Sequence, residues 1–207
     1  MSHRVRSTPD LAYARVEGTE LFLDLHRPEL DREVPVVACF HGGGWQRGSR
    51  KDMVSERLLP FAAQGVAVAS VGYRFIDAAT YPAQLHDGKA AVRWLRAHAG
   101  EFGLLGDRIG AWGASAGGWI ALMLALTGGE PEFDGGVGAD AGLDSSVNAA
   151  AAWFPITNLA TLASERETAG LTLPPFLQGR PAPDMAAALL AVADVAEDPV
   201  TAQVASP

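Results

Sequence analysis

The pentapeptide GASAG, at residues 113–117, constrains the fold of this chain more than any other segment. It lies between residues 108–112, which read as a short apolar strand, and residues 116–127, which read as an apolar helix. A chain that passes from strand to helix in one sharp turn brings the two elements very close together. Gly113 and Gly117 remove the side chains that would clash there. The sequence therefore predicts a strand–turn–helix unit of an α/β domain.

Strand-like and helix-like segments alternate along most of the chain, as expected for parallel strands joined by right-handed crossovers. The predicted segments are an edge hairpin at 12–26, strands at 34–40, 65–71 and 149–154, and helices at 54–64 and 82–99. The strands are almost continuously apolar, which is typical of a sheet that is covered on both faces. We expect one α/β domain over residues 1–207, with a mostly parallel central sheet.

Residues 82–99 carry an apolar stripe at helical spacing, formed by Leu85, Gly88, Val92, Leu95 and Ala99. This spacing predicts that the basic side chains between them face solvent. These basic side chains are Lys89, Arg93 and Arg96. The acidic, glycine-rich residues 130–144 lack the ligand spacing of a calcium loop, and we expect a surface loop without a metal.

Composition excludes several functional classes. The 207 residues carry 16 basic and 24 acidic side chains, for a formal charge of −8, and no basic cluster extends beyond Arg50-Lys51. Nucleic acid is therefore not an expected partner. The longest apolar run, 116–126, is too short to span a membrane. A lone Cys39 forms no internal disulfide, and residues 1–10 do not resemble a secretory signal, so we expect a cytoplasmic location.

The GASAG segment also indicates chemistry, because it matches the pattern Gly-x-Ser-x-Gly. A serine hydroxyl is a weak nucleophile and must be presented to a base and to the substrate at once. A sharp turn between strand and helix lifts the side chain of Ser115 above the sheet, and the helix N-terminus then points at the reacting centre. Ser115 is therefore the predicted nucleophile.

A second motif, HGGGW at residues 41–45, follows the buried strand 34–40. Acyl transfer passes through a tetrahedral oxyanion, which needs hydrogen-bond donors already aimed at the developing charge. Glycines let the backbone present its N–H groups without a side chain in the way. The predicted oxyanion hole consists of the N–H groups of Gly43, Gly44 and Ala116.

Together these motifs resemble the HGGG-type esterase/lipase group of α/β-hydrolases, the hormone-sensitive-lipase-like branch, and are close to small bacterial carotenoid- and feruloyl-esterase-like carboxylesterases. Four further matches lie at 72–74 (GYR), 81–85 (YPAQL), 90–96 (AAVRWLR) and 107–109 (DRI). The resemblance implies hydrolysis of a small-molecule ester through an acyl-enzyme on Ser115, without metal or cofactor. The aromatic residues expected to line the substrate pocket are Trp45, Tyr73, Phe75 and Trp119.

The catalytic base is the missing component. In the family that the chain resembles, the triad follows the order Ser, Asp or Glu, His. The five histidines here are His3, His26, His41, His86 and His98, and none follows Ser115. We expect a chain truncated before the last two strands of the fold, with residues 158–198 as a cap or insertion. A complementing C-terminal segment or a homo-oligomer would cover the strand left at the sheet edge.

Two other functions remain open at this point. Kynurenine formamidases carry similar loops, so an amide hydrolase is one alternative. Some proteins of this fold, such as the gibberellin receptors, bind a ligand and have lost the histidine. A strained serine turn argues against a pure binding protein, because such a protein has no need to keep the strain.

Overall fold

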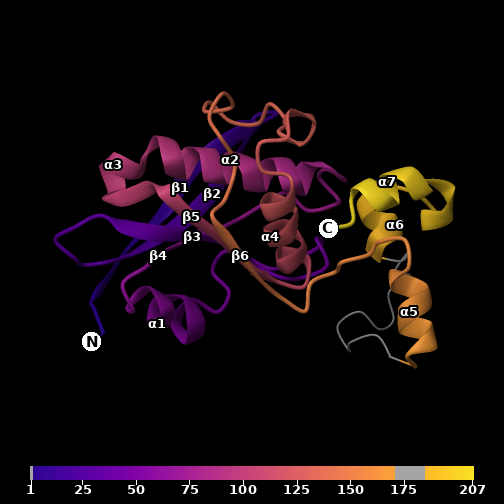
Figure 1. Cartoon of the computed structure of the whole chain (residues 1–207), viewed down its shortest axis with the longest axis horizontal. Helices are drawn as coiled ribbons and strands as arrows, with labels where there is room; N and C mark the ends of the chain where they lie inside the picture. Colours follow the sequence, from indigo (N-terminus) through magenta and orange to yellow (C-terminus); the bar gives the residue numbers. More distant parts are fainter. Residues whose placement is uncertain (1, 171–184) are drawn as a thin grey trace.

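The computed structural model describes residues 2–170 and 185–207 and contains a six-stranded sheet of order β1-β2-β4-β3-β5-β6 (Figure 1). The last four strands in this order run parallel, whereas β1 and β2 form an antiparallel hairpin joined to β4. The strands are β1 (Val5–Val16), β2 (Thr19–Pro28), β3 (Val34–Phe40), β4 (Ala67–Val71), β5 (Leu104–Ala114) and β6 (Ala149–Trp153). The predicted α/β class and the edge hairpin are confirmed, although the hairpin is longer than residues 12–26.

Helices lie on both sides of this sheet, with α2 and α1 on opposite sides in Figure 1. The predicted helix at 54–64 is a π-helical turn, η1, that continues into α1. The helical segments are η1 (Val54–Leu58), α1 (Leu59–Ala62), α2 (Ala83–Ala97), α3 (Ala99–Phe102), α4 (Ala116–Leu126), η2 (Pro131–Phe133), α5 (Leu162–Thr168), α6 (Met185–Leu190), η3 (Val195–Glu197) and α7 (Pro199–Val204).

The two faces of the sheet form two separate hydrophobic clusters. Along β3, Ala38 and Phe40 point into the large cluster that contains α2 and α4, whereas Val37 and Cys39 pack against the small cluster that contains α1. This alternation follows from the two-residue period of a strand. The small cluster has only four buried members among the described residues, which are Leu58, Ala62, Val68 and Trp112.

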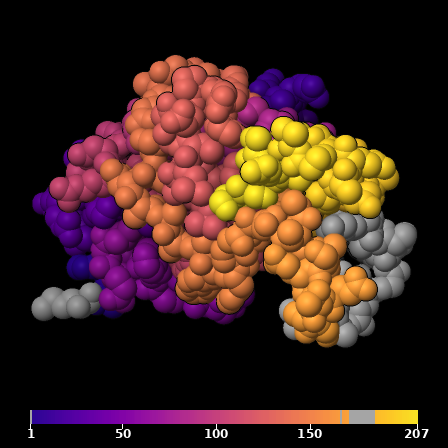
Figure 2. All heavy atoms as spheres, turned by 45° about the vertical axis from the view of Figure 1, so that its right-hand side comes forward, coloured from indigo at the N-terminus to yellow at the C-terminus, as the bar shows by residue number. Residues whose placement is uncertain are grey.

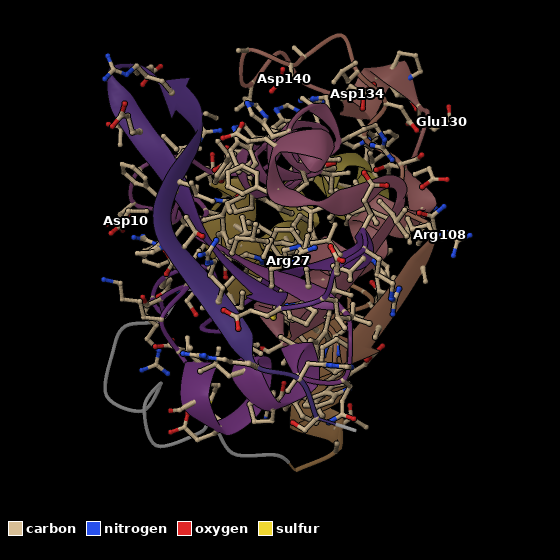
Figure 3. The ribbon with its side chains drawn as sticks, turned by 90° about the vertical axis from the view of Figure 1, so that its left-hand side faces the viewer. Asp10, Arg27, Arg108, Glu130, Asp134 and Asp140 are labelled. Atoms are coloured by element: carbon tan, nitrogen blue, oxygen red, sulfur yellow. The ribbon has the colours of Figure 1, made fainter. Side chains whose placement is uncertain are left out.

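The prediction that Lys89 and Arg93 face solvent is wrong, because both side chains are completely buried. Residues 130–146 pass over α2 and supply their partners (Figure 3, which labels Asp134). The Lys89 ammonium donates to Asp134 Oδ1 at 3.0 Å and to Thr127 O at 2.7 Å. The guanidinium of Arg93 donates to backbone carbonyls of the same loop, among them Val137 O at 3.2 Å. Buried cations need such partners.

The C-terminal helices pack beside α4 (Figure 2, yellow). The indole Nε1 of Trp119 donates to Ala205 O at 2.7 Å, and the backbone N–H of Tyr81 donates to Leu189 O at 2.8 Å. Ala186 and Leu189 of α6 are fully buried in the large cluster. These helices therefore extend the core on the α2–α4 side. Part of the predicted cap, residues 171–184, lies outside the described residues.

Strand β6 is different, because it forms the edge of the sheet and is largely exposed. Its burial pattern has four exposed residues and one intermediate residue. Trp153 is 40% exposed, and Phe154, which follows the strand, is 80% exposed. An apolar edge strand with free backbone groups is a site at which another strand can pair.

Candidate active site

Ser115 occupies the predicted turn between β5 and α4. Its backbone has φ 53° and ψ −121°, a conformation that non-glycine residues rarely adopt. Its N–H donates to Trp153 O at 2.9 Å, and its carbonyl accepts from Trp119 N at 2.9 Å. Strained backbone of this kind is concentrated at functional sites, where the surrounding structure holds it in place.

The glycines of the turn are required by close backbone approach. A Cβ placed on Gly113 would lie 2.2 Å from Gly117 O, and one placed on Gly117 would lie 2.1 Å from Phe40 O. A Cβ at Gly118 would lie 3.3 Å from Gly113 O, a tight contact but a less severe one. The pentapeptide is therefore fixed by sterics on both sides of the serine.

The HGGG segment lies against this turn. A Cβ on Gly42 would come 3.6 Å from Ser115 Cβ, so the two motifs are neighbours in space. Gly43 and Gly44 have φ values of 127° and 62°, which an L side chain disfavours. A Cβ on Gly43 would also lie 2.1 Å from Arg47 O. The loop can adopt this path only because these positions are glycine.

The three predicted oxyanion donors are not used elsewhere. Within the described part of the chain, no hydrogen bond engages the backbone N–H of Gly43, Gly44 or Ala116. Gly44 and Ala116 are buried, and buried backbone donors are almost always paired. Donors of this kind beside a strained serine are suited to stabilise a developing negative charge by donating hydrogen bonds to it.

His41 and Tyr73 hold the HGGG segment, called the oxyanion loop from here on, in place. Their rings stack at 4.5 Å, Tyr73 Oη donates to His41 O at 2.8 Å, and His41 Nδ1 lies 2.8 Å from Gly42 O. Burial lowers the pKa of His41, although its bond to Gly42 opposes the shift. A neutral imidazole that donates from Nδ1 to this carbonyl orders the loop.

The four aromatic residues predicted to line the pocket are unequally exposed. Trp45 and Trp119 are completely buried and meet edge to face at 5.5 Å, and Tyr73 is also buried. Only Phe75 is partly exposed. The two tryptophans therefore reach a substrate only through other side chains. Met185, which no motif indicated, lies next to Gly44.

No histidine in the described residues serves Ser115. The Ser115 hydroxyl has no hydrogen-bond partner there. His26 is buried on the hairpin beside Ser7, and His98 stacks on Trp94 at 4.3 Å. His86 on α2 is half-buried rather than solvent-facing. The thiol of Cys39 is no substitute nucleophile, because burial raises its pKa to about 12.

Comparison with known proteins identifies the family of a chain with this site. The sequence model of the BD-FAE family matches residues 23–207. The chain belongs to the BD-FAE family. It is 32% identical over 130 residues to a probable carboxylic ester hydrolase, LipM, of Mycobacterium tuberculosis, covering 61% of this chain and 30% of LipM. The carboxylesterase NlhH of the same organism is 38% identical over 110 residues, covering 52% of this chain and 34% of NlhH.

Solved structures show the same fold. A bifunctional GH43-CE protein of Bacteroides eggerthii superimposes with a TM-score of 0.79 at 27% identity, covering 97% of this chain and 26% of that one. Thermogutta terrifontis esterase 2 superimposes with a TM-score of 0.64 at 26% identity, covering 83% and 63%. The fold is that of the α/β-hydrolases. This BD-FAE chain spans about a third of the length of the curated relatives that it matches.

A cavity opens beside the serine turn on the α1 side of this BD-FAE chain. Its volume is about 300 Å³, and Gly42, Gly113 and Ala114 form the wall nearest Ser115. Asp52 and Arg57 also line it. A larger apolar cavity of about 570 Å³ lies next to it along β5 and β6, with walls that include Trp112 and Trp153. Arg57 and Trp112 line both cavities, which are therefore neighbours on the α1 side, the open face of the sheet.

Metal sites and membrane-spanning helices are both absent from the described residues. In the part of the chain that the structure describes, no three His, Cys, Asp or Glu side chains are grouped as a metal site. Among the same residues, no helix is long and apolar enough to cross a membrane.

Proposed function

We propose that this chain hydrolyses carboxylic esters through an acyl-enzyme on Ser115. The observation that carries the proposal is the strained serine beside three unused backbone donors. Ser115 Oγ attacks the ester carbon as a base removes its proton, and Gly43, Gly44 and Ala116 stabilise the oxyanion. The base returns the proton to the departing alcohol, and water then hydrolyses the acyl-enzyme.

The base itself would come from outside the described residues. We propose that a polypeptide segment pairs with β6, covers the open face and presents a histidine to Ser115 through the cavity at Gly42 and Ala114. The exposure of β6 and of Trp153 supports this, because both faces of a parallel sheet are normally covered.

A second copy of the chain is the other candidate for pairing with the free edge of β6. Size-exclusion chromatography would separate the two, since only self-pairing doubles the mass.

The alcohol side of the substrate is suggested by two structural neighbours. One, from gut microbiota, is described as a truncated carbohydrate esterase, and it superimposes with a TM-score of 0.71 at 25% identity. The GH43-CE protein matches 97% of the chain. We therefore propose small esters, with sugar esters as the first class to assay. The single cysteine is consistent with a reducing compartment such as the cytoplasm.

Covalent labelling with a fluorophosphonate tests the nucleophile directly. Intact mass and peptide mapping should place one adduct on Ser115, and S115A should remain unlabelled. Adduct on another residue, or equal labelling of S115A, would refute the assignment. Parallel assays of a nitrophenyl ester and N-formylkynurenine then separate an esterase from a formamidase. A chain that binds such ligands reversibly and forms no adduct even when imidazole is supplied as the base would be a binding protein.

A further inference from the structure

Residues 46–53, called the return limb here, lead from the HGGGW motif to η1, and none of them is buried. The limb nevertheless lies in direct contact with the oxyanion loop. A Cβ on Gly48 would lie 2.6 Å from Gly42 O, and a Cβ on Gly43 would lie 2.1 Å from Arg47 O. The position of the limb therefore limits where the backbone of the oxyanion loop can lie.

Arg50 connects the return limb to three strands of the sheet. Its Nε donates to Asp24 Oδ1 of β2 at 2.9 Å, and its Nη2 donates to Asp10 of β1, which is labelled in Figure 3. Its carbonyl accepts from Ser70 Oγ of β4 at 2.6 Å. The guanidinium also lies over the ring of Phe22, 5.6 Å from the ring centroid. A planar guanidinium can make the carboxylate and ring contacts together, which the point charge of a lysine cannot.

Asp24 is the fixed end of this connection. Its side chain belongs to a residue that is 4% exposed, and its Oδ1 also accepts from the backbone N–H of Asp10 at 2.8 Å. A carboxylate that is so buried needs a cationic partner, and removing that partner leaves an uncompensated charge. The pair therefore favours one position of Arg50, which is two residues from Gly48.

We propose that Arg50 is a positioning residue, which holds the oxyanion loop in place through its pair with Asp24. The inference rests on the proposed ester hydrolysis and deepens it, because it gives the edge hairpin a role in the site. Without the pair, the return limb moves, and the N–H groups of Gly43 and Gly44 are no longer held at fixed positions beside Ser115. Oxyanion donors that must first be ordered lose the advantage of preorganisation.

Amide hydrogen exchange in the full chain tests this without requiring turnover. The Gln46 N–H donates to Gly43 O at 3.2 Å, so its exchange rate reports the geometry of the oxyanion loop. The double variant R50A/D24N removes both charges and leaves no buried charge unpaired. We expect the Gln46 amide to exchange at least about tenfold faster in R50A/D24N than in the wild type, because the loop then opens locally. The amide of His98, at the end of α2, should exchange at the same rate in both proteins.

Fluorophosphonate labelling of Ser115 in the presence of imidazole measures the effect on the site. Loss of one oxyanion donor costs about 10²–10³ in rate, so displaced donors in R50A/D24N should slow labelling by at least about tenfold. R50K keeps the charge without the planar fork, and its labelling rate should lie between the two. E20A is the matched control, because it breaks the exposed Arg15–Glu20 ion pair of the same hairpin, and it should react like the wild type.

Thermal melting separates positioning from stability. R50A leaves Asp24 unpaired, so it should melt at a lower temperature than R50A/D24N, whereas both should be labelled slowly. Recovery of the wild-type labelling rate in R50A/D24N, or a wild-type exchange rate of Gln46 in that folded variant, would overturn the proposal. If both alanine variants fail to fold, R50K decides by the same two measurements. An unlabelled wild type would refute the nucleophile instead, and the exchange of Gln46 would still decide the role of Arg50.

Discussion

The two faces of the sheet differ sharply where they meet at Ser115. On the α2–α4 side, the serine turn, the oxyanion loop and α6 join one continuous core in which Trp45 and Trp119 are fully buried. On the α1 side, four buried residues form the second cluster of the described chain, and Trp153 is 40% exposed beside a cavity of about 570 Å³. The covered face thus holds the proposed nucleophile and the proposed oxyanion donors, and the open face borders the cavity through which we propose that a base enters.

This difference suggests that the two parts of such a site are stabilised separately. The serine turn and the oxyanion loop depend on the covered face, whereas the approach of a base depends on the open face. The strain of Ser115 is maintained by backbone contacts between β3, β5, β6 and α4, all of which are present in the chain. The base, in contrast, would in our proposal be supplied by a segment that pairs with the exposed edge strand β6. The following changes test whether the two faces differ in stability as they do in structure.

Placing a charge on each face should give the largest contrast. Ala111 is 2% exposed on the covered face, and A111K would bury an unpaired ammonium in the core. We expect a loss of about 4 kcal/mol or more of unfolding free energy, or insoluble protein. Ala151 of β6 is exposed, so A151K should change stability by less than about 0.5 kcal/mol. Urea unfolding measures both, and equal losses would remove the distinction between the faces.

Gly117 should be nearly as sensitive. Alanine there would place its Cβ 2.1 Å from Phe40 O and force the two backbones apart. We expect G117A to lose about 3 kcal/mol or more and to block labelling of Ser115. A Cβ added at Gly100 in α3 would meet no described atom within 4 Å, so G100A is the matched control and should be neutral or slightly stabilising. If G117A melted like G100A, the steric account of the turn would be wrong.

Most of the fold and of the serine turn could be predicted from sequence, because local signals determine them. Strands β3, β4 and β6 follow the predicted apolar runs, and the serine turn follows glycines at fixed spacing, whereas β5 (Leu104–Ala114) extends beyond the predicted residues 108–112 at both ends. Lys89 and Arg93 were mispredicted because their partners come from a loop about 40 residues away, including Asp134, and local periodicity contains no information about that loop. Trp45 and Trp119 were assigned to the pocket because they lie close to the motifs in the sequence, but both are completely buried, and the Trp119 indole donates to Ala205 O near the C-terminus, 86 residues away.

The buried lysine gives a smaller and more specific effect. Lys89 donates to Thr127 O, Asp134 Oδ1 and Ser145 Oγ, so K89M leaves three buried or half-buried acceptors without this donor. We expect K89M to lose about 3 kcal/mol of unfolding free energy. Lys51 is exposed, and K51M should fall within about 0.5 kcal/mol of the wild type. Calorimetric melting of both variants checks this, and a stable K89M would show that the loop does not depend on the ion pair.

The smallest effect concerns acid stability. Burial alone would raise the pKa of Asp134, but hydrogen bonds from Ser145 and Lys89 outweigh it and lower the pKa. A carboxyl with a lowered pKa contributes stability above its unfolded pKa, and this contribution is lost as the pH falls through the folded pKa. Between about pH 5 and pH 3, D134N should therefore show a shallower fall in urea midpoint than the wild type. Parallel slopes would contradict the assignment.

Free imidazole provides the most direct measurement of the central claim, which is that Ser115 is a complete nucleophile lacking only its base. A positioned general base contributes about 10²–10⁴ in rate. Imidazole that enters the cavity at Gly42 and Ala114 should recover part of this rate enhancement. We predict that it accelerates fluorophosphonate labelling of Ser115 by about tenfold or more with saturation, and that S115A stays unlabelled. Labelling that is indifferent to imidazole, or that occurs on another residue, would contradict the account.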